Sequence, residues 1–252
     1  MPRTVCLLLA CNYEGSSCEL SGCVNDAENL SEYLVGNGLA KREDITLIRE
    51  PTRAQIEGGL EDLANATHHD DVSDVFVSFS GHGTQVWDYS GDEEDGRDEC
   101  LCPSDFQKSG LIRDDELNRY FERMSHTVRV SVLIDACHSA TCVDLPHVYV
   151  GHQRTRASTR ASGPCHPDMM MISGCKDSQT SADLYDRNRN EYTGAMTSAF
   201  LDVLRLEPTL VQDAFSIVCA MRVLLWERRM TQVPQLSTST ALGCECRAFL
   251  RD

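Results

Sequence analysis

The sequence has no long hydrophobic run and no excess of basic residues. Its most apolar stretch near the N-terminus, Val5 to Ala10, is about a third of the ~20 residues that a membrane-spanning helix requires. It also lacks the longer apolar core and the cleavage site of a signal peptide. The 23 Lys and Arg residues face 39 Asp and Glu residues, a formal net charge of −16 at pH 7. We therefore expect a cytoplasmic protein that binds neither membranes nor nucleic acid, because phosphate backbones are bound mainly through basic side chains.

The sequence also lacks a Cys-x-x-Cys pair, although it contains 13 cysteines. Secreted disulfide frameworks are normally shorter and have an even number of cysteines. The two Cys-x-Cys pairs, Cys100/Cys102 and Cys244/Cys246, do not have the spacing of a zinc ribbon or a thioredoxin motif. A Cys/His metal-binding protein is an alternative that lacks recognisable ligand spacing, and most of the thiols are expected to be reduced apolar side chains.

Five segments are mostly apolar, without a regular polar alternation, which is typical of strands in a sheet covered on both faces. They are Thr4–Ala10, Asp44–Ile48, Val75–Phe79, Val128–Ile134 and Met169–Ile172. Helical patterns alternate with them. These are the apolar spacing from Val24 to Val35, a capping box at Thr52 and Gln55 that begins a helix, and the segments Asp114–Met124, Gly194–Leu206 and Thr209–Arg229. The alternation predicts an α/β fold with a central, mostly parallel sheet of about six to eight strands.

Two segments interrupt this alternation. Residues 88–116 contain eleven acidic and three basic residues, and we expect a long ordered loop with a function. Residues 145–167 contain no acidic residue but include Arg154, Arg156 and Arg160, which is typical of a flexible surface linker. We predict one domain in two parts: a larger part at residues 1–150, a basic linker at 151–167 and a smaller part at 168–252.

Two of the predicted strands end in reactive residues. The strand at Val75–Phe79 leads into Ser80-Gly-His82-Gly83, and the strand at Val128–Ile134 leads into Asp135-Ala-Cys137-His-Ser. Ligands of open parallel sheets bind beyond the carboxyl ends of the strands, so His82 and Cys137 are expected to lie side by side. An imidazole beside a thiol can ionise it and can protonate a departing amine, which is the chemistry of a cysteine peptidase.

These motifs resemble those of the caspase-like cysteine peptidases and, more narrowly, of the metacaspases. Further matches occur in the same order along the chain, over about residues 4 to 242. They are residues 22–27 (GCVNDA), 91–96 (GDEEDG) with Asp98-Glu99, 172–175 (ISGC), 177–183 (DSQTSAD) and 235–237 (QLS). The resemblance implies a caspase-like α/β/α sandwich. It also implies that Cys137 is the nucleophile, that His82 is the general acid and base, and that the N–H groups of Gly83 and Cys137 form an oxyanion hole.

The predicted specificity rests on two carboxylates. Asp26 and Asp135 are expected at the ends of the first and fourth strands, flanking the catalytic pair, with Ser80 and Cys23 as further lining. Two carboxylates in one pocket suit a guanidinium or an ammonium group. The resemblance implies the same preference, cleavage after Arg or Lys. An alternative role for Asp26 is a helix N-terminal carboxylate that interacts with the helix dipole.

The acidic segment raises the possibility of a metal site. It is not an EF-hand, because aligning the required glycine with Gly96 places Gly91 at the first ligand position and Cys102 at the twelfth. The resemblance implies that Ca²⁺ is held by Asp98, Asp114, Asp115 and Asp144. Asp114 and Asp115 could also cap the helix that follows them, and the two roles are compatible.

The sequence thus predicts a calcium-dependent cysteine endopeptidase that acts on protein or peptide substrates after Arg or Lys. An alternative is a catalytically silent, calcium-responsive interaction module with the same fold. By analogy with the family we expect a monomer. If the enzyme cuts after basic residues, self-cleavage is expected at Arg154, Arg156 or Arg160, because exposed linkers are preferred sites of nicking.

Overall fold

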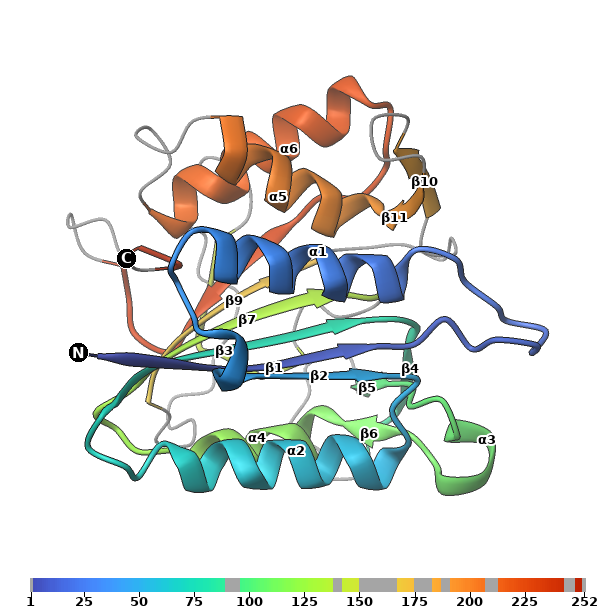
Figure 1. Cartoon of the computed structure of the whole chain (residues 1–252). Helices are drawn as coiled ribbons and strands as arrows, with labels where there is room; N and C mark the ends of the chain where they lie inside the picture. The colour runs from blue at the N-terminus through green and yellow to red at the C-terminus, as the bar shows by residue number, and fades with distance from the viewer. Residues whose placement is uncertain are drawn as a thin grey trace.

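The computed structural model describes residues 2–88, 96–137, 142–149, 167–174, 183–186, 191–206, 213–242 and 248–250. A seven-stranded sheet in the order β2-β1-β3-β7-β9-β12-β8 runs through the middle of the molecule (Figure 1). Its strands are β1 (Arg3–Ala10), β2 (Ile45–Arg49), β3 (Val72–Ser80), β7 (Arg129–Asp135), β8 (His147–Tyr149), β9 (Asp168–Ser173) and β12 (Gln235–Thr238). The predicted α/β class and the predicted number of six to eight strands are confirmed.

The sheet is mostly parallel. Strands β2, β1, β3, β7 and β9 pair in parallel, whereas β12 pairs antiparallel with both β9 and β8. The central strands are buried over nearly their whole length, because helices cover both faces of the sheet. The apolar runs of the sequence therefore mark these strands correctly.

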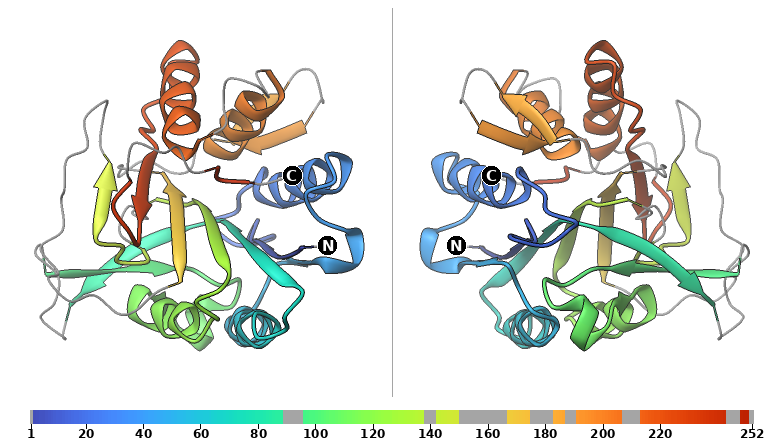
Figure 2. Two further views of the ribbon diagram at one scale, coloured as in Figure 1. Left: turned by 90° about the vertical axis from the view of Figure 1, so that its left-hand side faces the viewer. Right: turned by 90° about the vertical axis from the view of Figure 1, so that its right-hand side faces the viewer.

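Helices form a layer on each face. In Figure 1, α1, α5 and α6 lie on one side of the sheet and α2 and α4 on the other, and Figure 2 shows the same layering from two further directions. The helices are α1 (Cys23–Gly36), η1 (Arg42–Asp44), α2 (Arg53–Ala66), α3 (Phe106–Ser109), α4 (Asp114–Glu122), α5 (Ala195–Leu206) and α6 (Ala214–Glu227). In the part of the chain that the structure describes, no helix is long and apolar enough to cross a membrane.

Local sequence determines where two of these helices begin. At the start of α2, the Gln55 N–H donates to Thr52 Oγ1 at 3.4 Å and the Thr52 N–H donates to Gln55 Oε1 at 3.0 Å, which confirms the predicted capping box. The last long helix, α6, begins at Ala214, later than the predicted Thr209. Its first turn is capped by Asp213, whose carboxylate accepts the Ser216 N–H at 2.9 Å.

The acidic segment and the five residues before it contain more regular structure than the predicted loop. Strands β4 (Gly83–Trp87), β5 (Arg97–Leu101) and β6 (Ile112–Arg113) form a separate antiparallel sheet in that order. Strand β5 was missed because its sequence, Arg-Asp-Glu-Cys-Leu, buries two acidic side chains and shows no apolar alternation. The short helix α3 and the start of α4 complete the described part of this segment.

Strands from both sides of the predicted linker belong to the main sheet. Strands β9 and β12, from the predicted smaller part, continue the sheet next to β7. A two-stranded antiparallel pair, β10 (Asp183–Asp186) and β11 (Glu191–Gly194), precedes α5. The linker arginines Arg154, Arg156 and Arg160 lie outside the described residues, and the boundaries of the two parts stay a prediction.

Candidate active site

The register between β3 and β7 brings the two predicted catalytic residues to the same edge of the sheet. Ser80 and Asp135 are paired in this parallel ladder, and the Gly81 N–H donates to the Asp135 carbonyl oxygen at 3.2 Å. His82 and Cys137 each follow two residues after this pair, and both are partly exposed. The carboxyl edge of the sheet thus presents an imidazole and a thiol from neighbouring strands.

Gly83 is in close contact with the main chain of Cys137. A Cβ atom at position 83 would lie 2.0 Å from the Cys137 carbonyl oxygen and 3.2 Å from the Ala136 Cβ. No side chain fits in that space, so the β3–β4 connection can pass Cys137 only with glycine here. The two residues predicted to supply oxyanion-hole donors are therefore adjacent through their backbones.

The His82 ring is oriented by a main-chain group that the sequence did not reveal. Its Nε2 lies 2.8 Å from the carbonyl oxygen of Cys18, in the loop between β1 and α1. A carbonyl oxygen can only accept, so Nε2 carries the proton, and Nδ1 is the acceptor when the ring is neutral. This tautomer leaves Nδ1 able to take a proton from a thiol. A backbone carbonyl in a loop has no residue signature, which is why sequence analysis did not find this contact.

The two predicted specificity carboxylates lie together, but only Asp135 lies at the end of a strand as predicted. Asp135 ends β7, whereas Asp26 lies in the first turn of α1 and not at the end of a strand. A Cβ atom at Gly194 would lie 2.5 Å from a carboxylate oxygen of each, so the two carboxylates flank this glycine. Ser80 Oγ donates to Asp26 at 2.8 Å, and Cys23 is buried as the first residue of α1.

Both carboxylates are already hydrogen-bonded within the chain. The Gly194 N–H donates to Asp26 at 2.9 Å, and the N–H and hydroxyl of Thr197 each donate to Asp135 Oδ2 at 2.9 Å. These donors belong to the start of α5, where unpaired N–H groups attract negative charge. Asp26 and Asp135 are only 1% and 3% exposed, so in this structure they form a buried pair and not the lining of an open pocket.

The predicted metal ligands are only partly brought together. One carboxylate oxygen from each of Asp114, Asp115 and Asp144 lies within 4.8 Å of the others. Asp98 is outside this group of three, and its carboxylate lies 3.3 Å from Nη1 of Arg113. Burial, followed by the nearby charge of Asp144, raises the pKa of Asp114 to about 8. This is the behaviour of an acidic group whose charge lacks sufficient positive compensation.

The chemistry of this cluster fits a hard divalent cation. Its donors are carboxylate oxygens, which Ca²⁺ prefers. The Asn118 side chain, on the same face of α4, donates its amide N–H to Asp144 at 2.7 Å. Its amide oxygen is buried and accepts no hydrogen bond from any residue that the structure describes. The cluster therefore combines concentrated negative charge with an unused oxygen donor.

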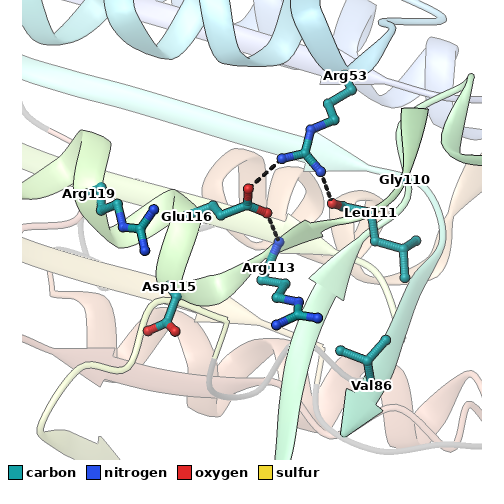
Figure 3. Close-up of a pocket in the computed structure, with 8 residues that line it drawn as sticks. All are labelled: Arg53, Val86, Gly110, Leu111, Arg113, Asp115, Glu116 and Arg119. Carbon is teal, nitrogen blue, oxygen red and sulfur yellow. Dashed lines mark hydrogen bonds and ion pairs between the residues drawn. The ribbon is translucent and has the colours of Figure 1, made fainter. Parts of the chain in front are cut away.

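A cavity of about 540 Å³ lies beside α4, and Asp115 is one of the residues that line it (Figure 3). In Figure 3 the side chains of Asp115 and Glu116 both extend from α4, and Arg53 forms an ion pair with Glu116. The Arg113 N–H also donates to Glu116 at 3.1 Å. Asp115 therefore belongs both to the cluster and to the lining of this cavity, whereas Asp114 and Asp144 are buried.

Comparison with known proteins identifies the family. Residues 3–243 match the caspase domain family. The chain is 35% identical to metacaspase-1 of Yarrowia lipolytica over 92% of this chain and 61% of that protein, and 35% identical to metacaspase-3 of Trypanosoma brucei brucei over 95% and 72%. It spans about 61 to 67% of the length of the first fungal relatives. The chain therefore belongs to the caspase domain family and, within it, to the metacaspases.

Solved structures show the same fold. A Geobacter sulfurreducens protein has a TM-score of 0.67 at 26% identity, covering 98% of both chains. Caspase-1 of Spodoptera frugiperda has a TM-score of 0.62 at 16% identity, covering 98% of this chain and 92% of that chain. The predicted metacaspase resemblance and caspase-like sandwich are both confirmed.

Proposed function

We propose that this protein is a cysteine endopeptidase in which Cys137 attacks the scissile carbonyl carbon. The observation that carries the proposal is the orientation of His82, whose Nε2–H is directed to the Cys18 carbonyl at 2.8 Å. His82 follows β3, and Cys137 follows the neighbouring strand β7. The free Nδ1 takes the thiol proton and returns it to the leaving amine. A thioester then joins Cys137 to the acyl part of the substrate, and water hydrolyses it with His82 as the base. The N–H groups of Gly83 and Cys137 stabilise the oxyanion.

The direct test replaces the nucleophile and the base separately. Cys137→Ala and His82→Ala should each abolish hydrolysis of an Arg-terminated fluorogenic peptide, because each removes an atom that forms or breaks a bond. Both positions lie at strand ends outside the core, so far-UV circular dichroism should not change. Cys142→Ala is a matched control, since Cys142 is a buried cysteine close in sequence. Retained turnover in Cys137→Ala would show that another thiol is the nucleophile.

We propose further that the cleaved peptide bond follows Arg or Lys. Asp26 and Asp135 are buried on either side of Gly194, and they accept hydrogen bonds from Gly194 and Thr197. Two carboxylates held close together favour a cationic side chain over an anionic one. A guanidinium offers the same kind of donor together with a positive charge, whereas an Asp side chain would add a third negative charge. Substrates are therefore proteins or peptides with accessible basic residues.

We propose finally that Ca²⁺ supports this activity through Asp114, Asp115 and Asp144, with Asp98 as a further candidate ligand. Bound calcium supplies positive charge that holds acidic side chains from separate segments together. Asp114 and Asp115 begin α4, and Asp144 lies beyond the nucleophile segment with a positive φ of 46°. Peptide hydrolysis in calcium, in magnesium at matched ionic strength and in a chelator tests this proposal. Equal rates in all three conditions would contradict it.

A further inference from the structure

Tyr13, in the loop after β1, holds the backbone of His82. The side chain is 3% exposed, and its hydroxyl accepts the His82 N–H at 2.8 Å while donating to the Cys102 carbonyl at 2.7 Å. The Cys102 N–H in turn donates to the His82 carbonyl at 3.0 Å. Both main-chain polar groups of His82 are thus engaged. One of them depends on a single phenolic hydroxyl from a segment 69 residues away.

The ring of Tyr13 also contacts the imidazole itself. The two ring centroids lie 4.8 Å apart with an interplanar angle of 32°. On another side, Phe106 meets the Tyr13 ring edge-on with a centroid distance of 6.2 Å. The imidazole is therefore supported by a packed aromatic ring and held at Nε2 by the Cys18 carbonyl. Such contacts restrict both the position and the plane of the His82 ring.

The loop that presents Tyr13 adopts an unfavourable backbone conformation. Tyr13 has a φ of 55°, and Glu50, the residue directly after β2, has a φ of 49°. The left-handed region is costly for bulky L-residues. It is stabilised here because the Glu50 carboxylate accepts the N–H groups of Asn12 at 2.5 Å and of Tyr13 at 3.0 Å. Backbone strain that the surrounding structure maintains so specifically is typical of functional sites.

The hydroxyl of Tyr13 acts as a fixed hydrogen-bond partner and not as an acid or base. Burial raises its pKa above the ordinary value for tyrosine, so the hydroxyl stays neutral at physiological pH. Its proton is donated to the Cys102 carbonyl, and its oxygen accepts the His82 N–H. Its effect on the reaction must therefore pass through His82.

We propose that Tyr13 is a positioning residue that fixes the His82 imidazole for proton transfer with Cys137. This inference rests on the proposed cysteine peptidase function. The hydroxyl anchors the His82 backbone, the ring sets the imidazole plane, and Glu50 holds the Tyr13 backbone in place. Removing the hydroxyl deprives the partly buried N–H of His82 and the buried carbonyl of Cys102 of this partner, which allows the His82 main chain to shift. A shift of a fraction of an ångström is enough to impair a proton transfer that requires close alignment.

The test compares Tyr13→Phe with Tyr149→Phe. Tyr149 is a matched control because it is 4% exposed, its hydroxyl accepts a backbone N–H from Leu242 at 2.8 Å, and its ring meets Phe215 edge-on. It lies on β8, at the far edge of the sheet from β2. Both variants lose a buried hydroxyl and should lose similar thermal stability. Only Tyr13→Phe should lower kcat, by about 10- to 100-fold, with KM changed less than about twofold.

A second measurement does not depend on peptide hydrolysis. The rate at which iodoacetamide alkylates Cys137, followed by peptide mass spectrometry across pH, reports the thiolate that His82 stabilises. The midpoint of this pH profile of the alkylation rate should move to higher pH in Tyr13→Phe and stay unchanged in Tyr149→Phe. Glu50→Gln keeps one acceptor for the N–H groups of Asn12 and Tyr13, and it should also move the midpoint to higher pH, but by less than Tyr13→Phe does. If the wild type cleaves no peptide, the proposed function fails while this profile still tests Tyr13.

Two results would overturn the inference. One is a kcat for Tyr13→Phe equal to that of Tyr149→Phe, which would reduce the effect to general stability. The other is an alkylation profile for Tyr13→Phe that coincides with the wild type.

Discussion

Replacing Asp144 by Asn should stabilise the calcium-free protein at high pH while weakening calcium binding. Carboxylate oxygens of Asp114 and Asp144 lie within 4.8 Å of one another. Two unit charges at that distance repel by about 3 kcal/mol at an effective dielectric constant of ~20. The Asn variant removes this repulsion and keeps an oxygen that can accept the Asn118 amide N–H. A gain of about 2–3 kcal/mol corresponds to a rise of roughly 4–12 °C in melting temperature for a domain of this size.

The sign of the pH dependence follows from the raised pKa of Asp114, which is about 8 instead of the usual 3.8. Between these two values the folded state keeps a proton that the unfolded state has released. The unfolding free energy of the wild type therefore falls as pH rises through this window. The variant should lose less stability over the same range, because one cause of the raised pKa is gone. The stabilisation should be small near pH 5 and largest near pH 9.

Thermal unfolding in a chelator at both pH values measures the first effect, and calorimetric titration with calcium measures the second. Glu122→Gln is a suitable control because Glu122 is an exposed acid at the end of the same helix. A variant that is no more stable than the wild type near pH 9, or one that gains equally at both pH values, would refute the reasoning. Unchanged calcium affinity would remove Asp144 from the metal site.

Two further predictions follow from the proposed specificity. Asp135→Asn should lower kcat/KM for an Arg substrate roughly 30-fold, a loss of about 2 kcal/mol in transition-state stabilisation, because it removes a buried charge partner. Peptide assays with Arg, Lys and Asp at the cleaved position measure this effect, and a wild-type preference for Asp would contradict the prediction. Calcium should also cause cleavage near residues 154–160, giving two fragments that co-elute because β7 and β9 pair in one sheet. Mass spectrometry locates the cut, and we expect a triple Arg→Gln variant of the linker to stay active on peptides.

Much of the fold could be predicted because local chemistry repeats along the chain. The central strands are rich in apolar residues, since a sheet covered by helices on both faces has no polar side. The start of α2 is encoded by two residues, Thr52 and Gln55, which bond each other's backbone. Strand β5 escaped because it buries Asp98 and Glu99 within a small sheet, where the usual pattern of apolar residues is absent.

The positions of His82 and Cys137 could be predicted from the sequence, because each follows an apolar segment that forms one of two neighbouring parallel strands. How the two side chains are held depends on the folded structure. The Cys18 carbonyl, the Tyr13 hydroxyl and the start of α5 reach the site from distant parts of the chain. Backbone donors and acceptors are the same in every residue, so no residue pattern marks the ones that a fold brings to a site. Only packing selects them, which is also why Asp26 and Asp135 are buried against α5 and do not line an open pocket.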